Sequence, residues 1–265
     1  MTPSPQHDKD FPWWLVILAV TGLWLFWQIL ADDMYSEALR ALSKGIWITV
    51  SVAVVAYLGA CGIGLGLALM GMSRHQILRQ VARLYIEVMR GVPILVLLLY
   101  VAWVVVPAAI DLVNWLAGTE IWRTRDVPLI ARAVVALMLA YSAFLAEIFR
   151  AGLQAVDKGQ IEAAQALGLN GWQRFRLVRF PQAFRLILPP LGNDFVAMVK
   201  DSSLVAVLGI GDIAQQAKVT AAGNFRYFET YNVAALIYLT MTIGLSLLMR
   251  RLEVRLRARS DGGER

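Results

Sequence analysis

Apolar stretches long enough to cross a bilayer occupy most of this chain. Six of them alternate with shorter polar segments, at residues 11–30, 46–70, 92–112, 129–149, 191–210 and 233–249. A helix of about twenty residues spans the hydrocarbon core, which is roughly 30 Å thick. Because a chain exposed to lipid must satisfy its own backbone hydrogen bonds, these lengths predict an all-α, polytopic membrane protein with about six transmembrane helices.

Composition agrees with a membrane location and argues against nucleic-acid binding. Only 17% of the residues are charged, whereas a soluble domain carries about a quarter. The formal charge of +6 would suit nucleic acid, but the basic residues gather beside the apolar stretches, as they do in cytoplasmic loops of membrane proteins. One cysteine, Cys61, and two histidines allow neither an intrachain disulfide nor a metal framework. We therefore expect no metal and no cofactor in this chain.

The basic residues also predict an orientation. Residues 74–90, 150–185 and 250–259 are rich in arginine, and six alternating spans would place all three segments on one side. By the positive-inside rule that side is the cytoplasm, together with both termini. The loops at 31–45 and 113–128 carry mixed charge and would face outward. The stretch 11–30 lacks a basic leader and a cleavage site, so we interpret it as a retained span.

Residues 157–181 lie between two spans but are too polar to cross a bilayer. Their distinctive members, in order, are Glu162, Ala163, Ala164, Gly168 and Pro181. Glu162 is expected in the first turn of a helix, where a carboxylate opposes the helix dipole. Gly168 can take the left-handed conformation that ends a helix, and Pro181 should end a second short helix at 171–180. The pattern favours a helix-turn-helix on the cytoplasmic face; an amphipathic helix lying on lipid headgroups is the alternative.

The order of these residues resembles the EAA signature of the permease subunits of ATP-binding-cassette (ABC) importers, in which this loop docks on the ATPase. Other motifs of the same family stand at 87–93, 140–152, 159–160, 189–193 and 200–204. The resemblance covers residues 44–253 and is closest to the polar amino-acid uptake subfamily of type I importers. Val92, Ala151 and Ser202 depart from the usual residues, but none of these departures removes a charge.

The resemblance implies a type I permease fold with an added first helix. Residues 1–43 would form a tail and this helix, 44–253 the permease domain, and 254–265 a basic cytoplasmic tail. It also implies alternating access of polar amino acids across the inner membrane, without catalysis by this chain. The implied partners are two ATPase subunits that hold ATP and Mg, a second permease in a homodimer or heterodimer, and an external solute-binding protein. No residue distinguishes acidic, basic or amide substrates.

A second polar group lies within and near the predicted fifth span. Its members are Asn193, Lys200, Asp201, Ser202 and Ser203. A charge at mid-bilayer costs at least about 2.5–3.5 kcal/mol, so Lys200 and Asp201 should either pair with each other or face a polar path, where the two serines would add hydrogen-bonding groups. Glu147 is spaced for an i,i+3 ion pair with Arg150 and is a further candidate for the path.

Two other functions remain open at this stage. An ion-coupled secondary transporter of small polar solutes usually has repeated halves and broken helices, and the sequence shows no such repeat. A membrane-embedded enzyme would need a nucleophile–base or metal set, and the chain also lacks the G-x-x-x-x-G-K-[ST] phosphate loop of an ATPase.

Gly62 and Gly66 form a small-xxx-small pair that predicts close helix contact.

Overall fold

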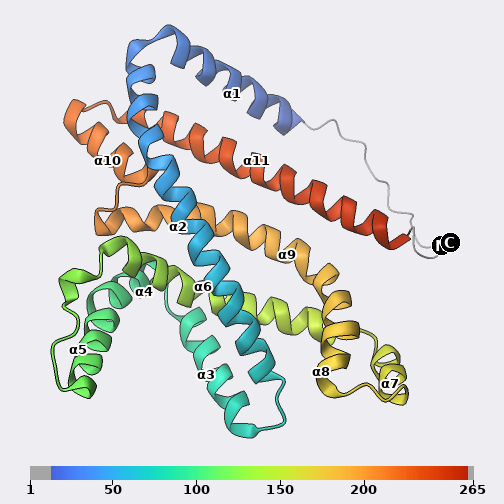
Figure 1. Ribbon diagram of the computed structural model, residues 1–265. Helices are drawn as coiled ribbons and strands as arrows, with labels where there is room; N and C mark the ends of the chain where they lie inside the picture. Colours follow the sequence, from blue (N-terminus) through green and yellow to red (C-terminus); the bar gives the residue numbers. More distant parts are fainter. Residues whose placement is uncertain (1–12, 262–265) are drawn as a thin grey trace, which may run out of the picture.

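A computed structural model describes residues 13–261, and all regular secondary structure among them is helical (Figure 1). The α-helices are α1 (Trp13–Ala31), α2 (Asp33–Gly71), α3 (Gln76–Gly91), α4 (Ile94–Tyr100), α5 (Val106–Ala117), α6 (Leu129–Gln154), α7 (Lys158–Ala166), α8 (Gly171–Gln173), α9 (Phe180–Asp201), α10 (Ile213–Asn224) and α11 (Tyr227–Asp261). Short π- and 3-10-helical segments lie between them: η1 (Val101–Val105), η2 (Thr124–Asp126), η3 (Arg174–Arg179) and η4 (Ser202–Leu208). The predicted N-terminal tail and the last four residues lie outside the described residues.

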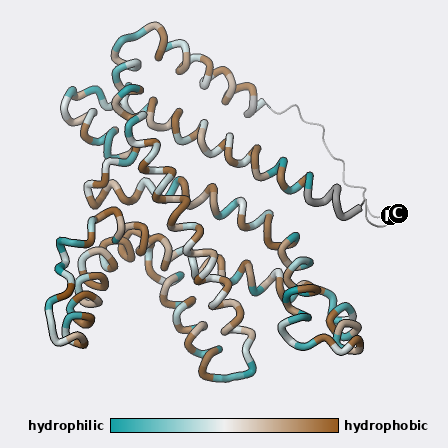
Figure 2. The backbone as a smooth tube through the Cα atoms, viewed as in Figure 1, coloured by the Kyte–Doolittle hydropathy of each residue, from teal (hydrophilic) through white to brown (hydrophobic). Residues whose placement is uncertain are grey.

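The long apolar helices confirm the all-α membrane architecture. Within residues 13–261, four helical stretches are long and apolar enough to cross a bilayer: Asp33–Gly71, Ile94–Ala117, Leu129–Gln154 and Tyr227–Arg255. They contain most or all of the second, third, fourth and sixth predicted spans. The first predicted span is also helical, as α1. Figure 2 shows apolar residues along these helices and polar residues gathered in the turns at their ends.

The predicted fifth span is wrong as a single α-helix. α9 starts earlier, at Phe180, and ends at Asp201, where the tighter turns of η4 follow. The Ser202 hydroxyl donates to the Val199 carbonyl oxygen at 2.8 Å, a local bond of the kind that competes with regular helix geometry. Gly209 then adopts a left-handed conformation with φ 75°, which stops the chain from continuing across the membrane as a helix.

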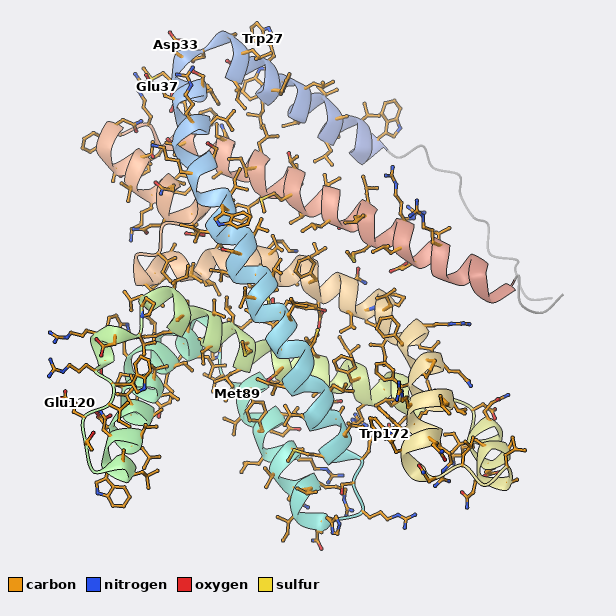
Figure 3. The ribbon with its side chains drawn as sticks, viewed as in Figure 1. Trp27, Asp33, Glu37, Met89, Glu120 and Trp172 are labelled. Atoms are coloured by element: carbon orange, nitrogen blue, oxygen red, sulfur yellow. The ribbon has the colours of Figure 1, made fainter. Side chains whose placement is uncertain are left out.

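The predicted loop at 31–45 is likewise mostly helical, because its charges lie on one side of a helix. The Asp32 carboxylate accepts the Met34 N–H at 2.8 Å and caps α2, which then runs without interruption for 39 residues. Asp33 and Glu37 are exposed at its outer end (Figure 3), while the opposite face is buried. The boundary that we placed at residue 43 therefore falls inside α2, and α1 is attached to the rest of the chain through this rigid helix.

The core lies where α2, α6 and α9 pack together. The faces of α2 and α6 that meet are rich in small side chains, namely Ala53, Ala56, Ala60, Ala133, Ala136 and Ala140. Small side chains allow helix backbones to approach closely, which is how helices associate in lipid. Tyr57 on α2 donates a hydrogen bond to the Leu191 carbonyl oxygen and so ties α2 to α9. These contacts fix the position of α9, which carries Pro181, Asn193, Lys200 and Asp201 of the predicted site residues.

Other helices and loops pack closely against α2 at glycines other than the predicted pair, Gly62 and Gly66. A Cβ atom added at Gly62 or Gly66 would meet no atom within 4 Å, so neither glycine contacts another helix of this chain. At Gly45, by contrast, an added Cβ would lie 2.5 Å from the backbone between Asp212 and Ile213. The prediction of a Gly62–Gly66 contact is therefore not met among the described residues. Backbone packs directly on Gly45 and also on Gly64, where an added Cβ would lie 2.9 Å from the Ser142 carbonyl oxygen, and the approach is tighter at Gly45.

We expect Gly45→Ala to lower the midpoint of thermal unfolding in detergent, because overpacking against a backbone costs about 1–3 kcal/mol. Gly66→Ala, on the same helix, is the matched control and should leave the midpoint unchanged or raise it, since alanine favours a helix by about 1 kcal/mol over glycine. Equal midpoints for the two variants would contradict the packing described for Gly45.

Candidate functional site

A polar elbow, residues 158–179, projects from one end of the helix bundle and contains α7, α8 and η3 (Figure 1). Asp157 caps α7, because its Oδ1 accepts the N–H groups of Gly159 at 2.6 Å and Gln160 at 3.3 Å. Glu162 thus lies in the second turn of α7 and not, as predicted, in the first. Gly168 has φ 79°, which confirms that it takes the left-handed conformation just after the helix end.

Pro181 does not end the second helix of the elbow, contrary to the prediction. α8, η3 and α9 follow one another without a break, so one helix runs over residues 171–201. Proline lacks an N–H, and its ring clashes with the carbonyl four residues earlier in a regular α-helix. The wider π-helical turn of η3, directly before Pro181, makes room for that ring. The second part of the elbow, residues 171–179, is therefore one end of the helix that also carries Asn193 and Asp201.

The elbow is fastened to the bundle by polar and aromatic contacts. Arg179 Nε donates to the Leu153 carbonyl oxygen at 2.9 Å, which joins the start of α9 to the end of α6. Ala164 is buried, and Phe175 packs against the main core. The ring of Phe175 lies 5.8 Å from the Trp172 ring and 5.6 Å from the Phe180 ring, centre to centre. A displacement of the elbow would thus be transmitted to both α6 and α9.

The outer surface of the elbow combines charge with exposed apolar side chains. Glu162 and Ala163 are exposed, and Leu167 and Trp172 are 82% and 66% exposed. Figure 3 shows Trp172 at the elbow and Glu120 at the opposite side of the molecule. Leu167 was not predicted from the sequence, although it is a large apolar residue directly before a glycine that ends a helix. An exposed leucine and tryptophan beside a carboxylate are suited to binding another protein.

The second predicted group divides between the surface and the interior of α9 and η4. Asn193 and Lys200 are both exposed, seven residues apart on one face. Asp201 Oδ2 accepts the Tyr141 hydroxyl at 2.7 Å, and no Lys200–Asp201 ion pair forms within the described residues. Ser202 is buried and its hydroxyl bonds to Val199, whereas Ser203 is half-buried.

Glu147 lies in a different place. Its Oε2 accepts Arg150 Nη2 at 2.6 Å, which confirms the predicted i,i+3 pair. Both residues line a cavity of about 490 Å³ between α2, α3 and α6, together with Arg83, Glu87 and Arg90. None of the predicted residues from 193 to 203 lines this cavity. The predicted path residues therefore belong to two sites and do not form a single cluster.

Three polar residues that hold the fold together were missed by the sequence analysis. Tyr141 could not be paired with Asp201 from sequence, because the two lie 60 residues apart. Arg132 is buried and donates to the carbonyl oxygens of Ala102 and Val127 at 3.1 and 3.0 Å. Asp212 caps α10, and its burial raises the pKa of its carboxyl above the ordinary value. Tyr141 is the most relevant to the site, because it ties α6 to the end of α9.

Comparison with known proteins shows which family has this sequence. Residues 60–258 match the model of a family described as the binding-protein-dependent transport system inner membrane component. The chain belongs to this family. It is therefore a multi-pass component of the inner membrane, and the match confirms the resemblance to ABC importer permeases that the motifs indicated.

Several relatives match most of this chain in sequence. The probable amino-acid permease protein YxeN of Bacillus subtilis is 36% identical over 212 residues, which cover 80% of this chain and 89% of the relative. The glutamine transport system permease protein GlnP of Escherichia coli K12 is 37% identical over 223 residues, or 83% and 94% of the two chains. The crystal structure of an amino acid ABC transporter with histidines superposes with a TM-score of 0.68 at 38% identity, and the match covers 82% of this chain and 94% of that one.

We expect Tyr141→Phe to lower the midpoint of thermal unfolding, because the half-buried Asp201 carboxylate loses its donor at a cost of about 1–3 kcal/mol. Tyr100→Phe is the matched control, since the Tyr100 ring is 54% exposed, and its midpoint should stay at the wild-type value. A Tyr141→Phe protein that unfolds at the same temperature as Tyr100→Phe would show that the tie between α6 and α9 contributes nothing.

Proposed function

We propose that this chain is the permease subunit of an ABC importer that moves polar amino acids across the inner membrane. The observation that carries the proposal is the elbow, which presents Glu162, Ala163 and Leu167 on α7 and at its end, directly before the helix of residues 171–201 that continues into the membrane core. The match of the chain to an amino-acid permease and a glutamine permease over most of their lengths supports the class of substrate.

The coupling follows from how the elbow is fastened. A separate ATPase that docks on the elbow would move η3, and η3 is continuous with α9. Arg179 joins α9 to the end of α6, and the Tyr141–Asp201 hydrogen bond joins the same two helices nearer the other end of α9. The pair α6–α9 would thus tilt as one rigid body when the ATPases close, which opens the bundle outward in an alternating-access cycle.

The exposed face of α9 is the part of the chain that we assign to the substrate path. Asn193 and Lys200 on this face, and the half-buried Ser203 at the start of η4, offer donors and acceptors for an amino-acid zwitterion. A lysine in this position is costly unless it faces water or a polar partner. Asp201 and Ser202 have structural roles, because the Asp201 carboxylate accepts a hydrogen bond from Tyr141 and the Ser202 hydroxyl donates one to the Val199 carbonyl oxygen. Glu147 would line the exit on the elbow side, in the cavity beside α3.

The partners of this chain follow from the same proposal. Two ATPase subunits would hold ATP and Mg, because this chain has no phosphate loop. A second permease, identical or similar, would complete the path, and an external solute-binding protein would deliver the amino acid. Both termini would be cytoplasmic, as the positive-inside rule predicts; for the C-terminal helix this agrees with Figure 1, where the end of α11 lies on the same side of the bundle as the elbow. The domain limits proposed above, 1–43, 44–253 and 254–265, remain part of this proposal.

The docking role is tested with Glu162→Lys and Gly168→Asp in a tagged full-length chain co-expressed with its ATPase. Each variant should reduce co-purified ATPase by about tenfold, which corresponds to about 1.4 kcal/mol of binding. The first reverses an exposed charge, and the second strains a residue with φ 79° and adds a charge. The yield of permease in the membrane should stay constant.

Arg125→Asp, an exposed charge reversal in the connection between α5 and α6 on the other side of the bundle, is the control and should retain the ATPase. Recovery of ATPase with Glu162→Lys and Gly168→Asp at the wild-type level would refute the assignment of the elbow as the docking site.

A further inference from the structure

The last turns of α11 carry an arginine cluster around a surface hollow. The hollow has a volume of about 330 Å³ and is lined by Arg250, Arg251, Arg255, Leu247 and Val254. At 100° per residue these five positions fall on one face of the helix. Glu253 falls on the other side, and no ion pair joins the three arginines to a carboxylate within the described residues. Three guanidinium groups thus share one face without an anionic partner there.

The apolar surface beside this cluster is also uncovered. In its most apolar part the α11 span is only 17% buried, against 56% for the α6 span. Ile243 and Leu247 are 40% and 53% exposed, and they lie two turns and one turn, respectively, before Arg250 and Arg251 on the same face. Val254 is 61% exposed and stands among the arginines. The face therefore changes from hydrocarbon to cationic along the helix.

The position of the arginines along α11 fits the membrane surface. From Tyr227 to Arg250 the helix rises by about 35 Å at 1.5 Å per residue, slightly more than the roughly 30 Å of the hydrocarbon core. Arg250, Arg251 and Arg255 would then stand among the lipid headgroups, on the side of the molecule where the elbow lies (Figure 1). The exposed leucine and isoleucine would lie at the depth of the acyl chains.

We propose that this face of α11, the α11 lipid site, binds an anionic phospholipid. The phosphate accepts hydrogen bonds from Arg250, Arg251 and Arg255, and one acyl chain lies on Ile243 and Leu247. Guanidinium groups bind phosphate in bidentate geometry, and each basic residue near an anionic membrane surface adds about 1 kcal/mol. A protein helix is the poorer occupant, because it would have to bury three unpaired arginines against itself.

The test measures lipid retained by the full-length protein, purified in detergent, by native mass spectrometry after addition of phosphatidylglycerol or phosphatidylcholine. The wild type should retain more phosphatidylglycerol than phosphatidylcholine. The triple variant Arg250→Gln, Arg251→Gln, Arg255→Gln should lose that preference by at least about tenfold, given a loss of about fivefold for each arginine.

The matched control, Arg123→Gln, Arg125→Gln, Arg226→Gln, removes the same charge from the other end of the bundle and should bind phosphatidylglycerol as the wild type does. If the triple variant of α11 loses its helical circular dichroism, Arg251→Gln alone is measured, with an expected loss of about fivefold.

Three results would overturn the proposal. They are equal retention by the wild type and a folded α11 variant, equal retention of the two lipids by the wild type, and an efficient disulfide between two copies bearing Val254→Cys in native membranes. The last would show that a second copy of the chain covers this face. None of these results bears on the docking of the elbow, so the proposed function would stand or fall separately.

Discussion

The continuity of one helix, residues 171–201, is the constraint on which the account depends. Its first two turns belong to the elbow, and its last turn carries Lys200 and Asp201. A helix of this length is stiff, and the π-helical turn of η3 admits Pro181 without breaking it. Movement of residues 171–179 therefore displaces the polar residues of α9 directly, and α7 is joined to this helix through the short turn at 167–170.

Lateral ties turn that helix into part of a larger rigid unit. Arg179 bonds to the end of α6 and Tyr141 to the end of α9, so the two helices are joined near both ends of α9. Tyr57 adds a third tie, from α2 to the Leu191 carbonyl, and the small residues of α2 and α6 bring the backbones close. Packed units that have two discrete arrangements can transmit small shifts from one site to another, which is the role proposed above for α6 and α9.

Periodicity and length in the sequence were enough to predict the apolar helices and the elbow, including the left-handed Gly168. Periodicity and length gave wrong predictions where tertiary contacts determine the backbone conformation. The loop at 31–45 is helical because its apolar face packs on α10 and α11, and α9 ends at Asp201 because Ser202 and Gly209 favour other geometries. The sequence also could not predict which polar residues of α9 and η4 are exposed and which are bonded inside the fold. For example, Tyr141 hydrogen-bonds to Asp201, which lies 60 residues away in the sequence.

The central claim, that the exposed face of the elbow meets a separate ATPase on the cytoplasmic side, is tested most directly at Ala163. In a chain with Cys61 replaced by serine, Ala163→Cys supplies a single exposed thiol on α7. The account predicts that a membrane-impermeant maleimide labels this thiol only after right-side-out vesicles are opened, and that a short bifunctional reagent joins it to the ATPase. Labelling of intact vesicles, or a failure to cross-link in the assembled complex, would contradict the account.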